Sequence, residues 1–382
     1  MYKKTFRRLL RISCLSLALM GMSLPTTDMA DVPADSPEIQ YFGRWDARDG
    51  VRRCGYGATY IKANFTGTSL KADMEGSGIW WRVSIDGEAF RRLKPQGKAT
   101  LLGKDLSPGE HKVLLVRSTE GQAGISEFRG FIVDDGAGLT KPDPLKKRRL
   151  EFVGDSITAG AINDGIFQGN NYNDVEDNDM SYGPQLARML HADYSVVAKS
   201  GQGVAHNYTE TWPLKGVHAC DSYDWTFFSN SFSPKNLSWD TEKFPVDAII
   251  LSLGTNDFSD PNRKPTAEEF KEGYRKLIAI VRKKNPGKPI ICTDPVPSSV
   301  NIRGRLWIRQ VVEEMSDQGY EKLYFISINE NGPLLKPEDF ADGTTHPTKE
   351  GSKKLAAYLK DKVAAILGWQ QENIHGTISP ES

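Results

Sequence analysis

Four short blocks of the chain carry residue types that nucleophilic catalysis requires. In chain order, their central residues are Ser156, Gly201, Asn256 and His346. The first three blocks directly follow segments that read as strands, namely Leu150–Val153, Tyr194–Ala198 and Val246–Ser252. The fourth precedes an amphipathic segment that is expected to be a helix, Thr348–Leu367. Loops beyond the carboxyl ends of parallel strands meet at one edge of a sheet, so we expect the four blocks to converge.

These residue types suit the hydrolysis of an ester. The hydroxyl of Ser156 is too weak an acid to attack a carbonyl unaided, so the imidazole of His346 would take its proton and later deliver it to the leaving alcohol. The tetrahedral intermediate carries a negative oxygen, and we expect an oxyanion hole made by the N–H groups of Ser156 and Gly201 and the amide of Asn256. This chemistry requires neither a metal nor a cofactor.

Each block also has a simpler explanation when it is taken alone. Asp-Ser after a strand can be a helix cap, a glycine can mark a tight turn, and a loop histidine can simply be solvated. His206 and His218 are rival candidates for the base. The order Ser, Gly, Asn, His, with every block at the end of an expected strand or the start of an expected helix, favours catalysis.

The region before these blocks is expected to be all-β. Residues 38–140 hold short segments rich in β-forming residues, which include Tyr60–Phe65, Ile79–Ile85, Phe90–Leu93, His111–Val116 and Phe128–Val133. Asp86-Gly87 offers a hairpin turn between two of them. Short strands at intervals of about 10–15 residues, without a helical period, predict a β-sandwich or jelly roll.

A different pattern follows the linker Asp134–Pro144, which is rich in Gly, Pro and Asp. In residues 146–370 the strand-like segments alternate with helical ones, and the further elements are strands at Ile290–Thr293 and Leu323–Ile326 and helices at Ser181–Leu190, Thr266–Lys284 and Ile302–Gln318. This alternation predicts a parallel sheet with helices on both faces. Residues 371–382 are expected to form a loose tail.

Two insertions interrupt the alternation. Ile162–Asp179 is rich in Asn and Asp, and Asn207–Asp240 is rich in aromatic residues. The tryptophans of the second insertion are weak candidates for sugar-binding platforms, and they are Trp212, Trp225 and Trp239. The alternative is that these aromatic side chains fix a long loop to the core.

The charge balance of the chain limits the class of partner. Lys and Arg together number 49, as do Asp and Glu, so the composition shows no excess of positive charge for binding nucleic acid or an anionic membrane. A neutral polysaccharide or a small ester suits such a surface.

The first 30 residues predict a signal peptide. Basic residues precede the apolar run Ile12–Leu24, and small and polar residues lead to Ala30, where cleavage is expected. The run is short for a membrane span, which needs about 20 residues, although a retained anchor is the alternative. We therefore expect a secreted or periplasmic protein that makes no membrane contact after cleavage. Cleavage would leave Cys54, Cys220 and Cys292, an odd number that makes no disulfide framework, although one pair stays possible.

At these blocks the chain resembles the SGNH hydrolases, also called the GDSL esterase/lipase superfamily. The matching motifs are GDSI at Ser156, SGQG at Gly201, GTND at Asn256 and THP at His346. Further segments resemble the N-terminal domain of carbohydrate esterase family two, and they are Tyr41–Arg44, Asn64–Thr68, Val83–Gly87, Leu106–His111 and Phe128–Phe131. The resemblance covers about residues 38–370 and implies a jelly-roll domain followed by a flavodoxin-like, three-layer α/β hydrolase domain.

The resemblance departs from the common pattern at the residue that would orient the imidazole. Many SGNH enzymes place an aspartate three residues before the histidine, where this chain has Gly343, while Asp342 lies four before. Either Asp342 completes a triad through a bend at Gly343, or a backbone carbonyl orients the imidazole in a Ser–His dyad. Asp155 and Asp257 are expected to brace loops by accepting hydrogen bonds from backbone amides.

The resemblance implies an acetylxylan esterase-like enzyme that removes O-acetyl groups from polysaccharides such as xylan or glucomannan. An acetylated polysaccharide or oligosaccharide is therefore the expected partner. Two alternatives remain: the same chemistry on another ester, such as a lipid, an aryl ester or acetylated peptidoglycan, and a non-catalytic carbohydrate-binding protein. The complete set of Ser, Gly, Asn and His argues against the second.

Overall fold

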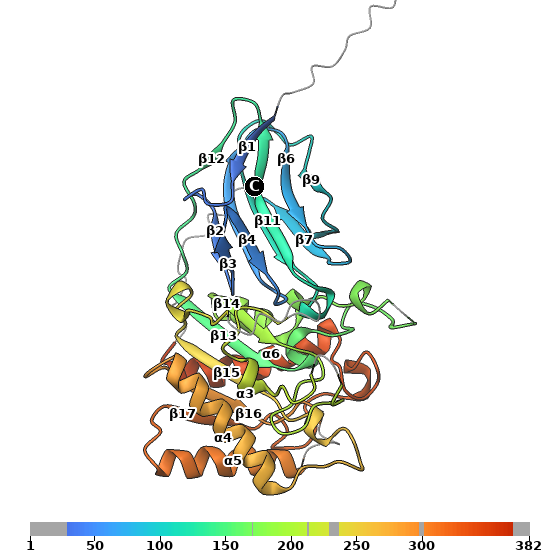
Figure 1. Ribbon diagram of the computed structural model, residues 1–382, viewed down its shortest axis with the longest axis vertical. Helices are drawn as coiled ribbons and strands as arrows, with labels where there is room; N and C mark the ends of the chain where they lie inside the picture. Colours follow the sequence, from blue (N-terminus) through green and yellow to red (C-terminus); the bar gives the residue numbers. More distant parts are fainter. Residues whose placement is uncertain (1–28, 170, 212–213, 229–236, 298–301, 370–382) are drawn as a thin grey trace, which may run out of the picture.

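The computed structural model describes residues 29–169, 171–211, 214–228, 237–297 and 302–369. They form two regions stacked end to end, an antiparallel β-sandwich and a parallel α/β region (Figure 1). The fold class expected from the sequence is therefore confirmed. The predicted tail 371–382 and residues 1–28 of the predicted signal peptide lie outside the described residues.

The sandwich consists of two facing antiparallel sheets. The first has the order β3-β4-β11-β6-β9, with β1 paired to β11, and its strands are β1 Met29–Pro33, β3 Asp46–Arg48, β4 Val51–Cys54, β6 Leu70–Glu75, β9 Gly97–Gly103 and β11 Ser126–Asp134. The second has the order β12-β5-β10-β7-β8, with β2 paired to β5, and its strands are β2 Gln40–Phe42, β5 Tyr60–Thr66, β7 Trp81–Ile85, β8 Arg91–Leu93, β10 Glu110–Arg117 and β12 Leu139–Thr140.

Large apolar side chains from both sheets fill the space between them. Phe65, Trp81 and Phe128 are among the buried residues of this core. Strands with long apolar runs were predicted from the sequence. β3, which has three residues and pairs only with the neighbouring β4, was not predicted, and neither was β6, which pairs with the distant β11. The strand β1 begins before residue 38 and includes Met29 and Ala30, the last two residues of the predicted signal peptide.

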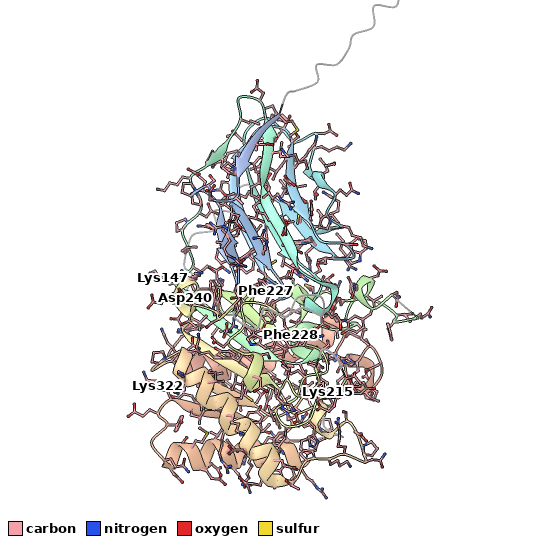
Figure 2. All side chains as sticks on the ribbon, in the orientation of Figure 1. Lys147, Lys215, Phe227, Phe228, Asp240 and Lys322 are labelled. Atoms are coloured by element: carbon pink, nitrogen blue, oxygen red, sulfur yellow. The ribbon has the colours of Figure 1, made fainter. Side chains whose placement is uncertain are left out.

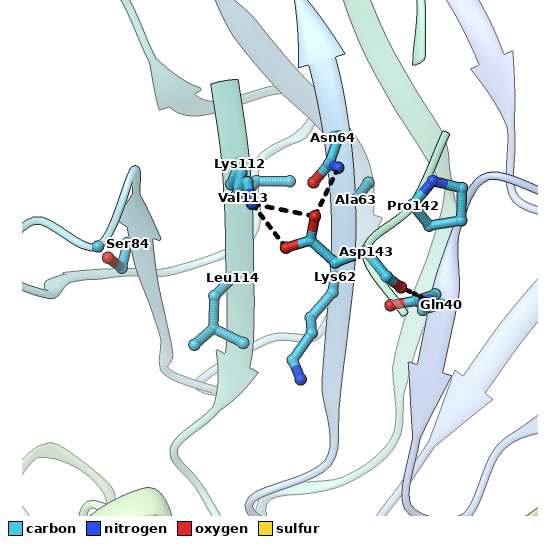
Figure 3. A pocket seen from close by; sticks show the side chains of 11 residues that line it. Gln40, Lys62, Ala63, Asn64, Ser84, Lys112, Val113, Leu114, Pro142 and Asp143 are labelled. Carbon is cyan, nitrogen blue, oxygen red and sulfur yellow. Dashed lines mark hydrogen bonds and ion pairs between the residues drawn. The ribbon is translucent and has the colours of Figure 1, made fainter. Parts of the chain in front are cut away.

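The linker after β11 is fastened to the sandwich rather than free. Within it, β12 pairs with β5, and the Asp143 carboxylate accepts hydrogen bonds from Lys112 Nζ at 2.8 Å and Asn64 Nδ2 at 3.2 Å (Figure 3). These residues line a hollow of about 180 Å³ on the outer face of the second sheet. None of the four sequence blocks contributes to its lining.

The α/β region is built on a parallel sheet with the order β14-β13-β15-β16-β17. Its strands are β13 Arg148–Gly154, β14 Ala192–Ala198, β15 Ala248–Ser252, β16 Ile290–Thr293 and β17 Leu323–Ile326. Its helices are α1 Ser156–Ala159, α2 Tyr182–Met189, α3 Ala219–Ser222, α4 Ala267–Lys284, α5 Ile302–Asp317 and α6 Lys349–Leu367. The chain steps from β13 out to β14 and then returns past β13 to β15, so the strand order reverses between β13 and β15. Ligands bind at such a reversal in open α/β sheets.

The helices cover both faces because right-handed crossovers in opposite directions leave their helices on opposite sides. α2 packs against α6, and α4 packs against α5. Thr266 caps α4 by accepting the N–H of Glu269, while the Glu269 carboxylate accepts the N–H of Thr266, and together they form a capping box. Among the described residues, no helix is long and apolar enough to cross a membrane.

A buried charge pair joins the two regions. Arg44, which follows β2, donates from Nη2 to both carboxylate oxygens of Glu151 on β13 at 3.2 Å. Its Nη1 donates to the carbonyls of Tyr223 and Trp225 in the second insertion. Phe228 of the same insertion lies where the sandwich meets the α/β region (Figure 2). The second insertion is therefore held between the two regions.

The aromatic side chains of that insertion mostly belong to the core, which corrects the expectation of sugar platforms. Trp239 is 3% exposed and lies 5.7 Å from the guanidinium carbon of Arg44. Trp225 is partly buried, with its ring centroid 5.2 Å from that of Phe228. The ring of Trp239 is therefore used for packing, and that of Trp225 packs in part against Phe228. Trp212 lies outside the described residues. Cys54, Cys220 and Cys292 are all free.

Candidate active site

Strand register brings the first three blocks together. On β13, Gly154 is aligned with Ala198 of β14 on one side and with Ser252 of β15 on the other. The blocks of Ser156, Gly201 and Asn256 leave the sheet just after these three aligned positions. Their convergence at one sheet edge follows directly from the parallel pairing.

Ser156 begins the short helix α1 and is only 6% exposed. Asp155 caps this helix by accepting the N–H of Ile157 at 3.0 Å. Burial raises the pKa of Asp155 to about 7. Gly154 is required by close packing, because a Cβ there would lie 2.0 Å from Thr158 Oγ1 and 2.8 Å from the Ser252 carbonyl oxygen. The turn that presents Ser156 is thus specified by its neighbours.

Asn256 and Asp257 hold the loop that contains Gly201. Asn256 Nδ2 donates to the carbonyl of Gln202 at 2.9 Å, which leaves its second amide proton for another acceptor. The Asp257 carboxylate accepts from three successive backbone N–H groups, those of residues 204–206. Burial raises the pKa of Asp257, and these hydrogen bonds oppose the rise. The predicted loop-bracing roles of Asp155 and Asp257 are confirmed by these contacts.

His346 reaches Ser156 from the loop before α6. Its Nε2 lies 2.9 Å from Ser156 Oγ, and its Nδ1 lies 2.7 Å from Asp342 Oδ2. The three groups therefore form a continuous serine–imidazole–carboxylate relay. The rival histidines have other contacts: His206 Nδ1 lies 2.8 Å from the carbonyl of Arg263, and His218 lies beside Glu210.

A tight loop explains how Asp342 reaches an imidazole four residues later. Asp342 Oδ1 accepts the backbone N–H groups of Thr344, Thr345 and His346 at 2.7–3.1 Å. Gly343 adopts φ +76°, a left-handed conformation that glycine tolerates. Partial burial acts to raise the pKa of Asp342, but the hydrogen bonds from His346 and these amides outweigh it and hold the pKa well below its usual range. Asp342 is accordingly an anion at neutral pH.

Two exposed aromatic residues, one bound to the Gly201 loop and one linked to it through Tyr172, were not predicted from the sequence. Tyr208 is 62% exposed, donates its backbone N–H to the Gly201 carbonyl at 2.7 Å, and has its Cβ near Gly201. Phe167 is 48% exposed and packs edge-on against Tyr172. Tyr208 stands among polar residues in the sequence, which distinguishes it from the clustered aromatics that are buried, whereas Phe167 follows the apolar Ile166 and carries no such signal.

Two family models match the chain. Residues 41–142 match the carbohydrate esterase 2 N-terminal domain, and residues 152–354 match the GDSL-like lipase/acylhydrolase family, which covers more than half of the chain. The chain belongs to the GDSL-like lipase/acylhydrolase family. It is a carboxylic ester hydrolase, and its resemblance to carbohydrate esterase family two is confirmed.

Characterised relatives of this esterase carry the same pair of regions. The chain is 29% identical to cellulase/esterase CelE of Acetivibrio thermocellus over 343 residues, which are 88% of the chain and 40% of that relative. It is 27% identical to an acetylxylan esterase / glucomannan deacetylase of Cellvibrio japonicus over 350 residues, with 87% of each protein covered.

Solved structures show the same architecture. A family two carbohydrate esterase from Cellvibrio japonicus superposes with a TM-score of 0.79 at 22% identity, over 90% of this chain and 99% of that one. A family two carbohydrate esterase from Clostridium thermocellum, solved in complex with cellohexaose, superposes with a TM-score of 0.76 at 27% identity, over 87% of this chain and 100% of that one.

Proposed function

We propose that this esterase removes O-acetyl groups from a polysaccharide such as xylan or glucomannan through an acyl-serine intermediate. The observation that carries the mechanism is the relay in which His346 lies 2.9 Å from Ser156 Oγ and 2.7 Å from Asp342. The substrate class is supported by the acetylxylan esterase / glucomannan deacetylase relatives and by the carbohydrate esterase 2 N-terminal match.

In the acylation step, Ser156 Oγ attacks the carbonyl carbon of the acetyl group while its proton passes to His346 Nε2. Asp342 holds the imidazole by its Nδ1–H and stabilises the imidazolium that forms. The N–H groups of Ser156 and Gly201 and the amide of Asn256 stabilise the negative oxygen of the tetrahedral intermediate.

Collapse of that intermediate breaks the bond between the acetyl carbon and the sugar oxygen. His346 gives its proton to the sugar oxygen, and the polysaccharide leaves with a free hydroxyl. A water molecule then attacks the acetyl-serine, and His346 accepts its proton. The bond between the acetyl carbon and Ser156 Oγ breaks, His346 returns the proton to Oγ, and acetate is released. Bonds and protons balance with only Ser156, His346 and water taking part.

The sugar chain requires a surface beside the relay. The exposed Tyr208 binds the Gly201 carbonyl through its backbone N–H, and the exposed Phe167 packs against Tyr172, whose hydroxyl lies 2.8 Å from Ser200 Oγ. Ile166, next to Phe167 in the chain, is 75% exposed. An exposed apolar patch bordered by polar residues is typical of a ligand-binding groove. We assign these side chains to substrate contact in place of the buried tryptophans. A polysaccharide substrate also agrees with the export signal expected in the first 30 residues.

Acetate release from a panel of substrates tests this proposal. The panel includes acetylated xylan, acetylated glucomannan and acetylated peptidoglycan, with 4-nitrophenyl acetate as a general ester. We expect release from at least one plant polysaccharide and, in Ser156→Ala, less than about 1% of that rate with the thermal midpoint nearly unchanged. Activity on 4-nitrophenyl acetate or peptidoglycan alone would overturn the substrate class. A Ser156→Ala rate above 1% would exclude Ser156 as the nucleophile.

A further inference from the structure

A loop of the sandwich reaches into the proposed active site. Residues 118–125 connect β10 to β11, and Glu120 in this loop is fully buried. One carboxylate oxygen of Glu120 accepts the backbone N–H of Ser200 at 2.9 Å, and the other accepts the hydroxyl of Ser200 and the hydroxyl of Tyr172, the latter at 2.9 Å. Ser200 directly precedes Gly201. A side chain of one region thus binds the residue next to an oxyanion donor of the other.

We propose that Glu120 is a positioning residue, which fixes the Ser200–Gly201 peptide so that the Gly201 N–H faces the developing oxyanion. This inference rests on the proposed acyl-serine mechanism. It gives the sandwich a definite part in catalysis, although no residue of the sandwich touches the reacting atoms.

The carboxylate is itself held in place from the sandwich side. The buried guanidinium of Arg117 donates to the carbonyls of Thr119, Glu120, Gly124 and Cys54 at 2.6–3.1 Å. A Cβ on Gly121 would lie 1.8 Å from the carbonyl oxygen of Phe228, so the loop is seated directly on the second insertion. Because the backbone of the loop is fixed in this way, Glu120 can hold Ser200 in one position.

A second carboxyl group supports this arrangement without touching the Gly201 loop. Glu176 accepts the backbone N–H of Glu120 at 3.2 Å and a hydrogen bond from Asn178. Burial, together with the nearby Glu120 carboxylate, raises the pKa of Glu176 well above its usual range. Glu176 is therefore the matched control, because Gln is close in shape and charge to a neutral carboxylic acid.

The Gly201 loop has anchors on both sides. Asn256 holds residue 202 and Asp257 holds residues 204–206, both from within the α/β region. Glu120 holds the opposite end of this segment, at residue 200. Without Glu120 the segment keeps the anchors at residues 202 and 204–206 and the bond from Tyr208 N–H to the Gly201 carbonyl, but it loses the anchor at residue 200. The fold should therefore survive while the direction of the Gly201 N–H is relaxed.

Steady-state kinetics on 4-nitrophenyl acetate gives the first test. A displacement of about 1 Å at a reacting group can cost about 10²-fold in rate. We expect kcat to fall about 10²-fold in Glu120→Ala and about tenfold in Glu120→Gln, with KM changed less than about threefold because the donor acts mainly in the transition state. Glu176→Gln should retain kcat within about threefold.

Inhibition by a small alkylboronic acid gives a readout that a merely structural role would not move. Its tetrahedral adduct with Ser156 places an oxygen in the oxyanion hole, so its Ki should rise in proportion to the loss of kcat/KM across the Glu120 variants. An unchanged kcat in Glu120→Ala would overturn the proposal. A lower kcat with an unchanged boronate Ki would also overturn it.

Two further variants keep the test decisive. If Glu120→Ala does not fold, Ser200→Ala removes only the hydroxyl link, and it should lower kcat several-fold with a matching rise in the boronate Ki; no change in either would overturn the proposal. Ser156→Ala separates this inference from the proposed function. Full activity in Ser156→Ala refutes both, whereas an inactive Ser156→Ala beside a fully active Glu120→Ala refutes the positioning role alone.

Discussion

The two halves of the proposed active site are held by different kinds of structure. Ser156 and Asn256, which are 6% and 7% exposed, follow register-matched strands of the central sheet. The side chains of His346 and Asp342 are 25% and 31% exposed and stand on a loop that is held by its own hydrogen bonds. The buried half is positioned by the hydrophobic core and by the backbone hydrogen bonds between the strands of the sheet. The exposed half depends on the Asp342 carboxylate, which makes four hydrogen bonds to Thr344, Thr345 and His346.

Because of this difference, we expect mutations in the two halves to differ in how strongly they affect the reaction and the stability of the fold. Disturbing the loop half should change the reaction with little effect on folding, because few buried contacts depend on it. Disturbing the packing of the sheet half should affect both, whereas Ser156→Ala removes only a hydroxyl and should affect the reaction alone.

The largest effect is expected for Asp342→Asn. An asparagine would present an N–H₂ group to the Nδ1 atom of His346 and favour the wrong tautomer, for which a loss of about 10⁴ in kcat is known from a serine protease triad. The measurement is kcat on 4-nitrophenyl acetate beside His346→Ala, with the thermal midpoint as a control. A loss of less than about tenfold in Asp342→Asn, with near-complete loss in His346→Ala, would establish a dyad and remove Asp342 from the site.

A smaller effect is expected for Asn256→Ala in the sheet half. Loss of one oxyanion donor lowers kcat by about 10²–10³, with a small change in KM, because the interaction forms in the transition state. The neighbouring Ser259→Ala removes a hydroxyl that binds the Asn256 carbonyl and serves as the control, with kcat expected within about threefold. A change confined to KM would make Asn256 a ground-state binding residue instead.

The smallest effect on catalysis, and the sharpest contrast in stability, should come from two glycines. At Gly154 a methyl group meets Thr158 and the Ser252 carbonyl, so Gly154→Ala should lower the free energy of unfolding by about 1–3 kcal/mol. At Gly343 there is open space within 4 Å and only the positive φ opposes alanine, at a cost of about 1 kcal/mol that the exposed loop can partly relieve. Thermal midpoints measured for both variants compare the two halves. Equal decreases would contradict the difference between them.

Much of the fold and of the site could be predicted from the sequence because the signals are local. The continuous apolar run before Asn256 indicates a buried parallel strand, and the blocks at Ser156, Gly201 and Asn256 follow strands whose ends must share one edge. The capping box at Thr266 fixed the start of α4 to the residue. Two strands of the sandwich lack such a local signal and were not predicted: β3 is only three residues long and largely polar, and β6 pairs with β11, far away in the chain.

The sequence by itself determined the chemistry of the site: which serine, which histidine and which amide could act together, and at which edge of the sheet. Only the tertiary structure decided three further matters. It bent the loop at Gly343 so that Asp342 meets His346, it placed Trp225 and Trp239 in packing contacts and left Tyr208 and Phe167 exposed, and it brought Glu120 to Ser200 across 80 positions of the chain. Burial and side-chain pairing between distant segments depend on how whole layers pack, and no local pattern of residue types carries that information.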